Sequence, residues 1–149
     1  ESVQALIAAG LNGGDVITVG REQPFYGGAW ANSVNDEVLN EIYNSVDFVM
    51  CMSTSEGMGL PALEAMSVGA VPVLPRDLTT REEFFPTQVF PEYEFVKDAE
   101  TAKDFMLTLM RDKERMCEMK TRLVNHFERF WRENLNGDGV AKKILEVVK

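Results

Sequence analysis

Apolar residues recur along the chain in two patterns, with helical spacing in some segments and in short continuous runs in others. The runs Asp15–Val19, Asp47–Met52 and Ala70–Leu74 predict β-strands, the last weakened by Pro72. The second run does not alternate between apolar and polar residues, which favours burial on both faces, as in a parallel sheet. The helical spacing predicts these helices: Ser2–Leu11, Asp36–Ser45, Pro61 to Ser67 or Val68, Asp98–Met110, Asp112–Asn134 and Val140–Val148.

The predicted helices carry their own start and stop residues and their own buried faces. Asn35 or Asp36 is expected to cap the helix that begins at Asp36, and Gly69 is expected to end the helix that follows Pro61. The Met and aromatic stripe of the longest helix is more typical of a core than of a cofactor contact. The expected inward positions are Val38, Leu39, Ile42, Ala102, Phe105, Met106, Leu109, Met110, Met116, Met119, Leu123, Phe127 and Phe130.

Helices and buried strands alternate through the first half of the chain. That alternation is typical of an α/β protein with a Rossmann-like, doubly wound parallel sheet, here followed by C-terminal helices. Arg21–Val34 is predicted to be a long loop, and long loops are often functional. Arg76–Glu92 is predicted to be irregular, and Phe95–Val96 a last short strand. The 149 residues suit a single domain that spans positions 1–149.

The net charge and the residue content of the chain restrict the kinds of molecule to which it is expected to bind. The net charge of −9 disfavours general binding to DNA, RNA or anionic membranes, although a small anion can still bind at a helix N-terminus. No apolar run approaches the roughly 20 residues that span a bilayer, and no secretory leader is visible, so a cytoplasmic location is expected. Cys51 and Cys117 have no CxxC partner and are expected to be reduced, and the lone His126 favours no metal site.

Two glutamates flank a glycine-rich entry into the predicted helix that follows Pro61. In an open parallel sheet, ligands bind beyond the carboxyl ends of the strands, where Ser53–Leu60 is expected to lie. The helix start offers N–H groups to a diphosphate, and Glu64 can accept hydrogen bonds from a ribose diol. Spacing alone leaves the alternative open, in which Glu56 is a loop carboxylate and Glu64 only complements the helix dipole.

The same segment resembles a known enzyme family. Its residues read Ser53-x-x-Glu56-Gly-Met-Gly59-Leu-Pro61-x-Leu-Glu64-Ala-Met-x-x-Gly69-x-x-Pro72-Val73. This pattern is similar to the E-x7-E motif of the retaining GT-B glycosyltransferases of family 4, also called glycosyl transferases group 1. Met58 stands where the family usually has an aromatic residue. The helix and strand before the motif and the helices after it also resemble the family.

The resemblance implies the C-terminal donor-binding domain of a two-domain, retaining, metal-independent glycosyltransferase without a cofactor. The donor would be a nucleoside-diphosphate sugar, and an N-terminal domain outside this chain would bind the unknown acceptor. By the resemblance, Glu56 would be catalytic and contact the donor sugar, while Glu64 would hold the ribose. The remaining contacts implied for the donor are Gly57, Met58, Gly59 and Leu60 around the diphosphate, and Arg21 and Phe25 near the base.

The front of the family domain has no counterpart in this sequence. Asp15–Val19 matches the third strand of the family, so the first strands are expected to be missing. Three explanations stay open: the chain is a fragment of a longer enzyme, another chain supplies the strands, or the alignment of the first 35 residues is wrong. The fragment alone is expected to be inactive. An alternative function is a non-catalytic interaction module derived from a transferase half, and an epimerase or phosphorylase on the same plan is a third.

Overall fold

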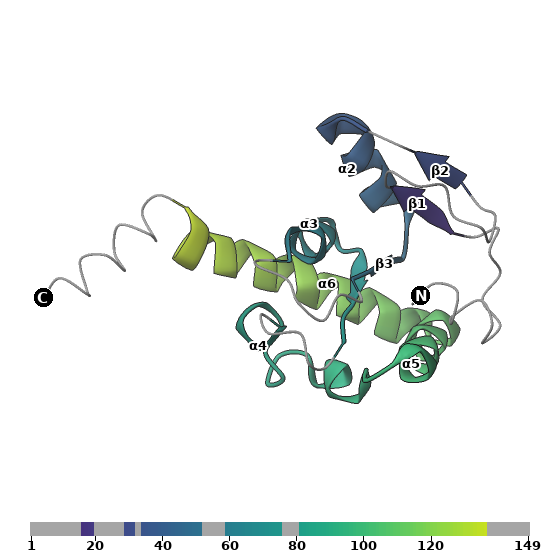
Figure 1. Cartoon of the computed structure of the whole chain (residues 1–149). Helices are drawn as coiled ribbons and strands as arrows, with labels where there is room; N and C mark the ends of the chain where they lie inside the picture. Colours follow the sequence, from purple (N-terminus) through teal and green to yellow (C-terminus); the bar gives the residue numbers. More distant parts are fainter. Residues whose placement is uncertain (1–15, 20–28, 32–33, 52–58, 76–80, 137–149) are drawn as a thin grey trace, which may run out of the picture.

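The computed structural model describes residues 16–19, 29–31, 34–51, 59–75 and 81–136. Figure 1 shows the long helix α6 running beside α3 and α5, with β1, β2 and α2 at one end of the molecule. The predicted helices Ser2–Leu11 and Val140–Val148 lie outside the described residues. The elements are β1 (Ile17–Val19), β2 (Ala29–Ala31), α2 (Asp36–Ser45), β3 (Phe48–Met50), α3 (Leu60–Val68), β4 (Val71–Val73), α4 (Arg81–Phe84), the 3₁₀-helix η2 (Pro91–Phe95), α5 (Ala99–Arg111), α6 (Lys113–Phe130) and the π-helical η3 (Trp131–Leu135).

The described strands form two parallel pairs. β1 pairs with β2, with Thr18 opposite Trp30, and β3 pairs with β4, with Val49 opposite Pro72. The connection from β3 to β4 contains α3, as parallel pairing requires a crossover. The predicted α/β class and the parallel pairing are therefore confirmed. Within the described residues the two pairs are separate sheets.

Strand β2 corrects the prediction that Arg21–Val34 is a loop without regular structure. Ala29–Ala31 pairs along β1, and the Ala29 N–H donates to the carbonyl oxygen of Val16 at 3.1 Å. Ala-Trp-Ala has no run of β-branched residues and no alternation, so local sequence does not mark it as a strand. The partner strand β1 supplies the hydrogen bonds that a short segment of weak propensity needs.

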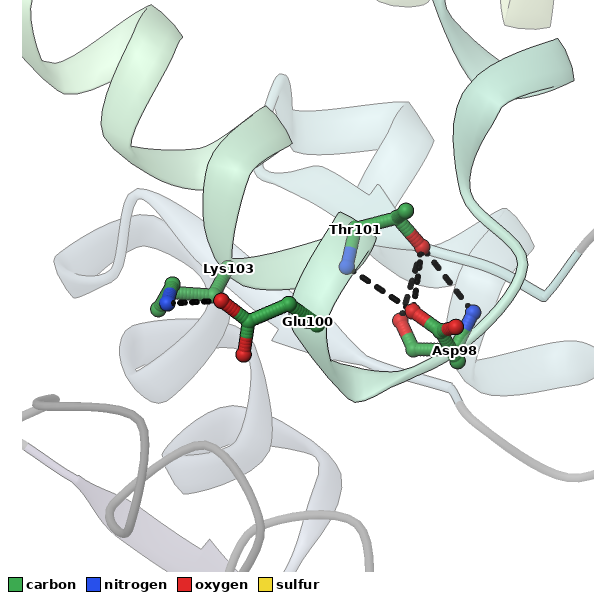
Figure 2. Close-up of polar contacts among 4 residues, drawn as sticks. All are labelled: Asp98, Glu100, Thr101 and Lys103. Carbon is green, nitrogen blue, oxygen red and sulfur yellow. Dashed lines mark hydrogen bonds and ion pairs between the residues drawn. The ribbon is translucent and has the colours of Figure 1, made fainter.

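Local capping residues set the helix boundaries close to where the sequence predicts them. α2 spans the predicted residues, and the side chain of Asn35 accepts from the N–H of Val38 at 2.9 Å. Asp98 caps α5: its carboxylate accepts from the N–H of Thr101 at 2.9 Å, and the Thr101 hydroxyl accepts from the N–H of Asp98 at 3.0 Å (Figure 2). The bond from the Thr101 N–H lowers the pKa of the Asp98 carboxyl, as expected for a capping box.

The core lies between α3, β4, η2, α5 and α6. In α6, Met119 and Leu123 are completely buried, and Met116, Phe127 and Phe130 pack against them, so the predicted core stripe is confirmed. The helix ends at Phe130, earlier than predicted, and continues as the wider η3 turn. The buried hydrophobic residues are Ala62, Leu63, Ala65, Met66, Ala70, Val71, Val73, Leu74, Phe84, Phe85, Phe90, Tyr93, Val96, Ala102, Met106, Leu109, Met119 and Leu123.

Two expected inward residues are exposed instead. Val38 is 40% exposed, because it lies in the first turn of α2, and α2 packs on α3 while burying none of its own residues completely. Met110 is 54% exposed, in the last turn of α5 just before the chain turns into α6 at Asp112. Both positions fit the helical period, but they lie at helix ends where the partner helix no longer covers them.

The predicted strand Phe95–Val96 is wrong, since Pro91–Phe95 forms a 3₁₀-helix. In β4 the backbones of Val71 and Val73 bond toward β3, so the backbone of Pro72 faces the opposite edge. Pro72 has no N–H to offer there, and its carbonyl oxygen accepts from the hydroxyl of Tyr93 at 2.7 Å. A side chain therefore occupies the edge at which a further strand would pair. The predicted irregular stretch Arg76–Glu92 likewise contains the short helix α4, and η2 begins within it at Pro91.

His126 gives the fold a pH dependence. Its ring meets Phe90 edge to face at 5.3 Å between centroids and stacks near Phe130. Desolvation and then the charge of Arg129 lower the pKa of His126, and the backbone of Phe84 and the charge of Glu133 oppose this only in part. Neither ring nitrogen has a partner with good hydrogen-bond geometry among the described residues. The folded state therefore favours the neutral imidazole.

We expect the free energy of unfolding to have its full contribution from neutral His126 above the ordinary histidine pKa of about 6.5. Below that pH the contribution should decline, because the unfolded chain then binds the proton more readily than the folded chain does. Melting temperatures of the wild type and of His126→Gln, measured from about pH 8 to pH 5, check this. The difference between the two melting temperatures should be constant near pH 8. Below about pH 6.5 the melting temperature of the wild type should fall relative to that of His126→Gln. Parallel curves over the whole range would contradict the prediction.

Candidate functional site

The start of α3 is the part of the predicted site that the structure describes best. Gly59 precedes the helix with φ +66° and ψ +43°, a left-handed conformation that glycine adopts without strain. Its carbonyl oxygen accepts from Ala62 and Leu63, at 3.0 and 3.2 Å, while Pro61 fixes the first turn. The N–H groups of Gly59 and Leu60 precede these first helical bonds, and groups at such positions are the ones that bind anions.

Leu60 and Glu64 lie on the exposed face of α3, opposite the face buried in the core. They are four residues apart, so they are neighbours along one side of the helix. Leu60 is 56% exposed, and Glu64 is also exposed. The opposite side buries Ala62, Leu63, Ala65 and Met66 against the core. The side chains of Leu60, in the first turn, and of Glu64 therefore lie on the same exposed face of α3.

The carboxylate of Glu64 is held by a residue from another helix. The hydroxyl of Tyr43 in α2 donates to Oε2 of Glu64 at 2.9 Å. Burial, followed by the hydrogen bond and the charge of Glu64, raises the pKa of Tyr43. The hydroxyl therefore keeps its proton, and with it the hydrogen bond, over the ordinary pH range.

Sequence reasoning did not assign a role to Tyr43. The residue is separated from Glu64 by 21 positions, and no motif spacing links the two. An inference from sequence would require knowing that α2 and α3 pack side by side, which only the tertiary structure gives. A tyrosine near the end of an otherwise exposed amphipathic helix is the one local feature that could have drawn notice.

The predicted site residues divide into two groups. Gly59, Leu60 and Glu64 are described, and the structure brings them together at the start of α3 as expected from their spacing. The others lie outside the described residues, so their predicted roles stay predictions: Arg21, Phe25, Glu56, Gly57 and Met58.

Other features of the described ranges do not add to this site. Cys51 and Cys117 form no disulfide with each other. No cluster of three or more His, Cys, Asp or Glu side chains with a geometry for metal binding occurs in the ranges that the structure describes. Among the same residues, none of the helices has the length and apolar character required to cross a membrane.

Comparisons with known proteins identify no family for this chain. No family model matches the chain, and searches of curated proteins and of solved structures found no match to it.

Proposed function

We propose that the chain is the donor-binding domain of a cytoplasmic, retaining, metal-independent glycosyltransferase, and that it binds a nucleoside-diphosphate sugar. The observation that carries the proposal is the start of α3, where a left-handed Gly59 precedes the first-turn N–H groups and the exposed Glu64 follows one turn further along. A diphosphate suits the N–H groups and the positive end of the helix dipole. A ribose suits the carboxylate one turn further along, because a carboxylate accepts hydrogen bonds from hydroxyl groups.

The position of this helix in the fold also supports the proposal. α3 follows β3 and leads back to β4 in a parallel pair, so its first turn lies at the carboxyl ends of the strands, where open α/β sheets bind ligands. The resemblance of the segment from Ser53 to Val73 gives the same region the same role. Glu56 would then contact the donor sugar near the reacting carbon, and the acceptor would come from a domain outside this chain.

The strand pairing fits part of the sheet that the proposal requires, although the Tyr93 hydroxyl takes the edge of β4 where the sixth strand of that sheet would pair. In the strand order 3-2-1-4-5-6, strands 2 and 3 are neighbours, and strands 4 and 5 are neighbours. β1 and β2 fit the first of these pairs, and β3 and β4 fit the second. On this assignment β2, and not Asp15–Val19, corresponds to the third strand of the family, and the position of the first strand lies between the two pairs.

Nucleotide binding to the wild type and to Glu64→Ala tests the proposal. UDP, GDP, ADP and their sugars are titrated calorimetrically, and melting temperatures are measured with each. We expect one nucleotide to raise the melting temperature of the wild type with increasing concentration, and Glu64→Ala to weaken its binding by about tenfold or more. The side chain of Glu64 is exposed, so the variant should still fold.

Glu118→Ala is the matched control, since Glu118 is also an exposed helical glutamate but lies on α6. Its affinity for the nucleotide should equal that of the wild type. If a folded wild-type chain shows no binding to any of these nucleotides, donor binding by this chain is refuted, and the interaction-module alternative gains support.

A further inference from the structure

The hydrogen bond from Tyr43 to Glu64 joins a half-buried ring to an exposed carboxylate. An exposed glutamate on a helix samples several rotamers, and fixing it costs conformational entropy when a ligand binds. A bond from a neighbouring helix fixes the carboxylate in advance. Tyr43 thereby links the orientation of Glu64 to the packing of α2 against α3.

The ring of Tyr43 is half-buried. It lines a hollow of about 340 Å³ between the ends of α2 and α3 and the middle of α6. Val46, Val68 and Val124 supply apolar walls to this hollow, and Lys120 at its rim forms an ion pair with Asp47 at 2.6 Å. Tyr43 is half-buried whereas Glu64 is exposed, so the carboxylate is the partner with more conformational freedom to lose.

A carboxylate has about four acceptor sites. The Tyr43 hydroxyl uses one of those on Oε2, which leaves acceptor capacity on the same group for a ligand hydroxyl. Because the hydroxyl keeps its proton, it donates to Glu64, and the other acceptor sites of the carboxylate stay open to a ligand. The bond thus orients the carboxylate without occupying it fully.

We propose that Tyr43 is a positioning residue that makes the site selective for ribose over a 2′,3′-dideoxyribose by holding the carboxylate of Glu64 toward the ligand hydroxyls. This inference rests on the proposed function, since it requires a nucleotide at the start of α3. The competing explanation is that the bond only ties α2 to α3. The two differ in one measurable quantity, the ratio of affinities for ribonucleotides and for nucleotides that lack the ribose hydroxyls.

The test compares the wild type with Tyr43→Phe. Affinities are measured calorimetrically for whichever of UDP, GDP and ADP binds the wild type, and for its 2′,3′-dideoxy counterpart. We expect Tyr43→Phe to weaken binding of the ribonucleotide by about five- to tenfold and to leave the dideoxynucleotide unchanged, so the affinity ratio falls. Phenylalanine keeps the ring in the hollow, so the fold should survive the change.

Two further variants make the result specific. In Glu64→Ala, adding Tyr43→Phe should weaken ribonucleotide binding by less than twofold, because no carboxylate is left for the Tyr43 hydroxyl to orient. Ser67→Ala is the matched control, since the hydroxyl of Ser67 donates to the backbone carbonyl of Glu64 at 2.7 Å and not to its carboxylate. Its affinity ratio should equal that of the wild type.

The outcomes separate this inference from the proposed function. If the wild type binds none of the nucleotides, the proposed function itself fails. If the wild type prefers the ribonucleotide through Glu64 and Tyr43→Phe leaves that preference unchanged, the role of Tyr43 is overturned while the function stands. If Tyr43→Phe lowers the melting temperature and weakens the binding of both nucleotides equally, the positioning role of Tyr43 is also overturned. The hydrogen bond would then serve only to hold α2 against α3.

Discussion

Replacing Tyr93 with alanine is expected to lower the free energy of unfolding by about 4 kcal/mol, because the change empties the centre of the core. Tyr93 is fully buried. Its ring centroid lies 5.6 Å from that of Phe85 and 5.4 Å from that of Phe105. Removing the ring loses these contacts and leaves a cavity that the neighbouring side chains fill only in part.

The conservative change Tyr93→Phe isolates the hydroxyl. It keeps the ring contacts but leaves the carbonyl oxygen of Pro72 without the bond that Tyr93 donates at 2.7 Å. A buried acceptor that loses its partner costs about 1–3 kcal/mol, so Tyr93→Phe should account for a minor part of the loss in Tyr93→Ala. Burial raises the pKa of Tyr93, so the hydroxyl donates over the ordinary pH range.

Urea denaturation of both variants measures these losses. Phe95→Ala is the control, because Phe95 lies two residues away on the same 3₁₀-helix but is 68% exposed. Its free energy of unfolding should stay within about 0.5 kcal/mol of the wild type. A Tyr93→Phe variant as stable as the wild type would contradict the idea that this hydroxyl satisfies the edge of β4.

Helices whose ends and buried faces are determined by nearby residues were predictable from sequence. The bounds of α2 and the end of α3 depend on Asn35 and Gly69, residues whose capping roles follow from local chemistry. The core stripe of α6 repeats over several turns, so its inward face was evident from the helical period. In each case the information lies within a few residues of the structure it determines.

Elements that depend on distant partners were not predictable. Ala29–Ala31 becomes a strand because β1 pairs with it, and Phe95–Val96 does not become one because Tyr93 occupies the edge of β4. The candidate site divides in the same way. The exposed face of α3 with Leu60 and Glu64 follows from helical spacing, whereas the bond from Tyr43 requires α2 and α3 to pack together.

The end of α3 should tolerate side chains poorly, and Gly69→Val is expected to lower the free energy of unfolding by about 3 kcal/mol. Gly69 has φ +81°, the left-handed region that a β-branched residue avoids. A Cβ atom there would also lie 3.3 Å from Cγ2 of Val124 and 3.7 Å from Cβ of Lys120, both on α6. Backbone strain and crowding against α6 therefore add in this variant.

Gly69→Asn separates the two causes, because asparagine carries the same Cβ atom but tolerates the left-handed conformation better. We expect Gly69→Asn to lower the free energy of unfolding by about 1 kcal/mol. Val124→Ala removes the crowded atom, so the loss caused by Gly69→Val should shrink in that background, and only the backbone term should remain. Urea denaturation of the wild type, Gly69→Val, Gly69→Asn, Val124→Ala and the double variant Gly69→Val/Val124→Ala checks this, and equal losses for Gly69→Asn and Gly69→Val would refute the role of backbone strain. The exposed start of α3 lies at the opposite end of the helix, so nucleotide affinity of the folded Gly69→Asn variant should match that of the wild type.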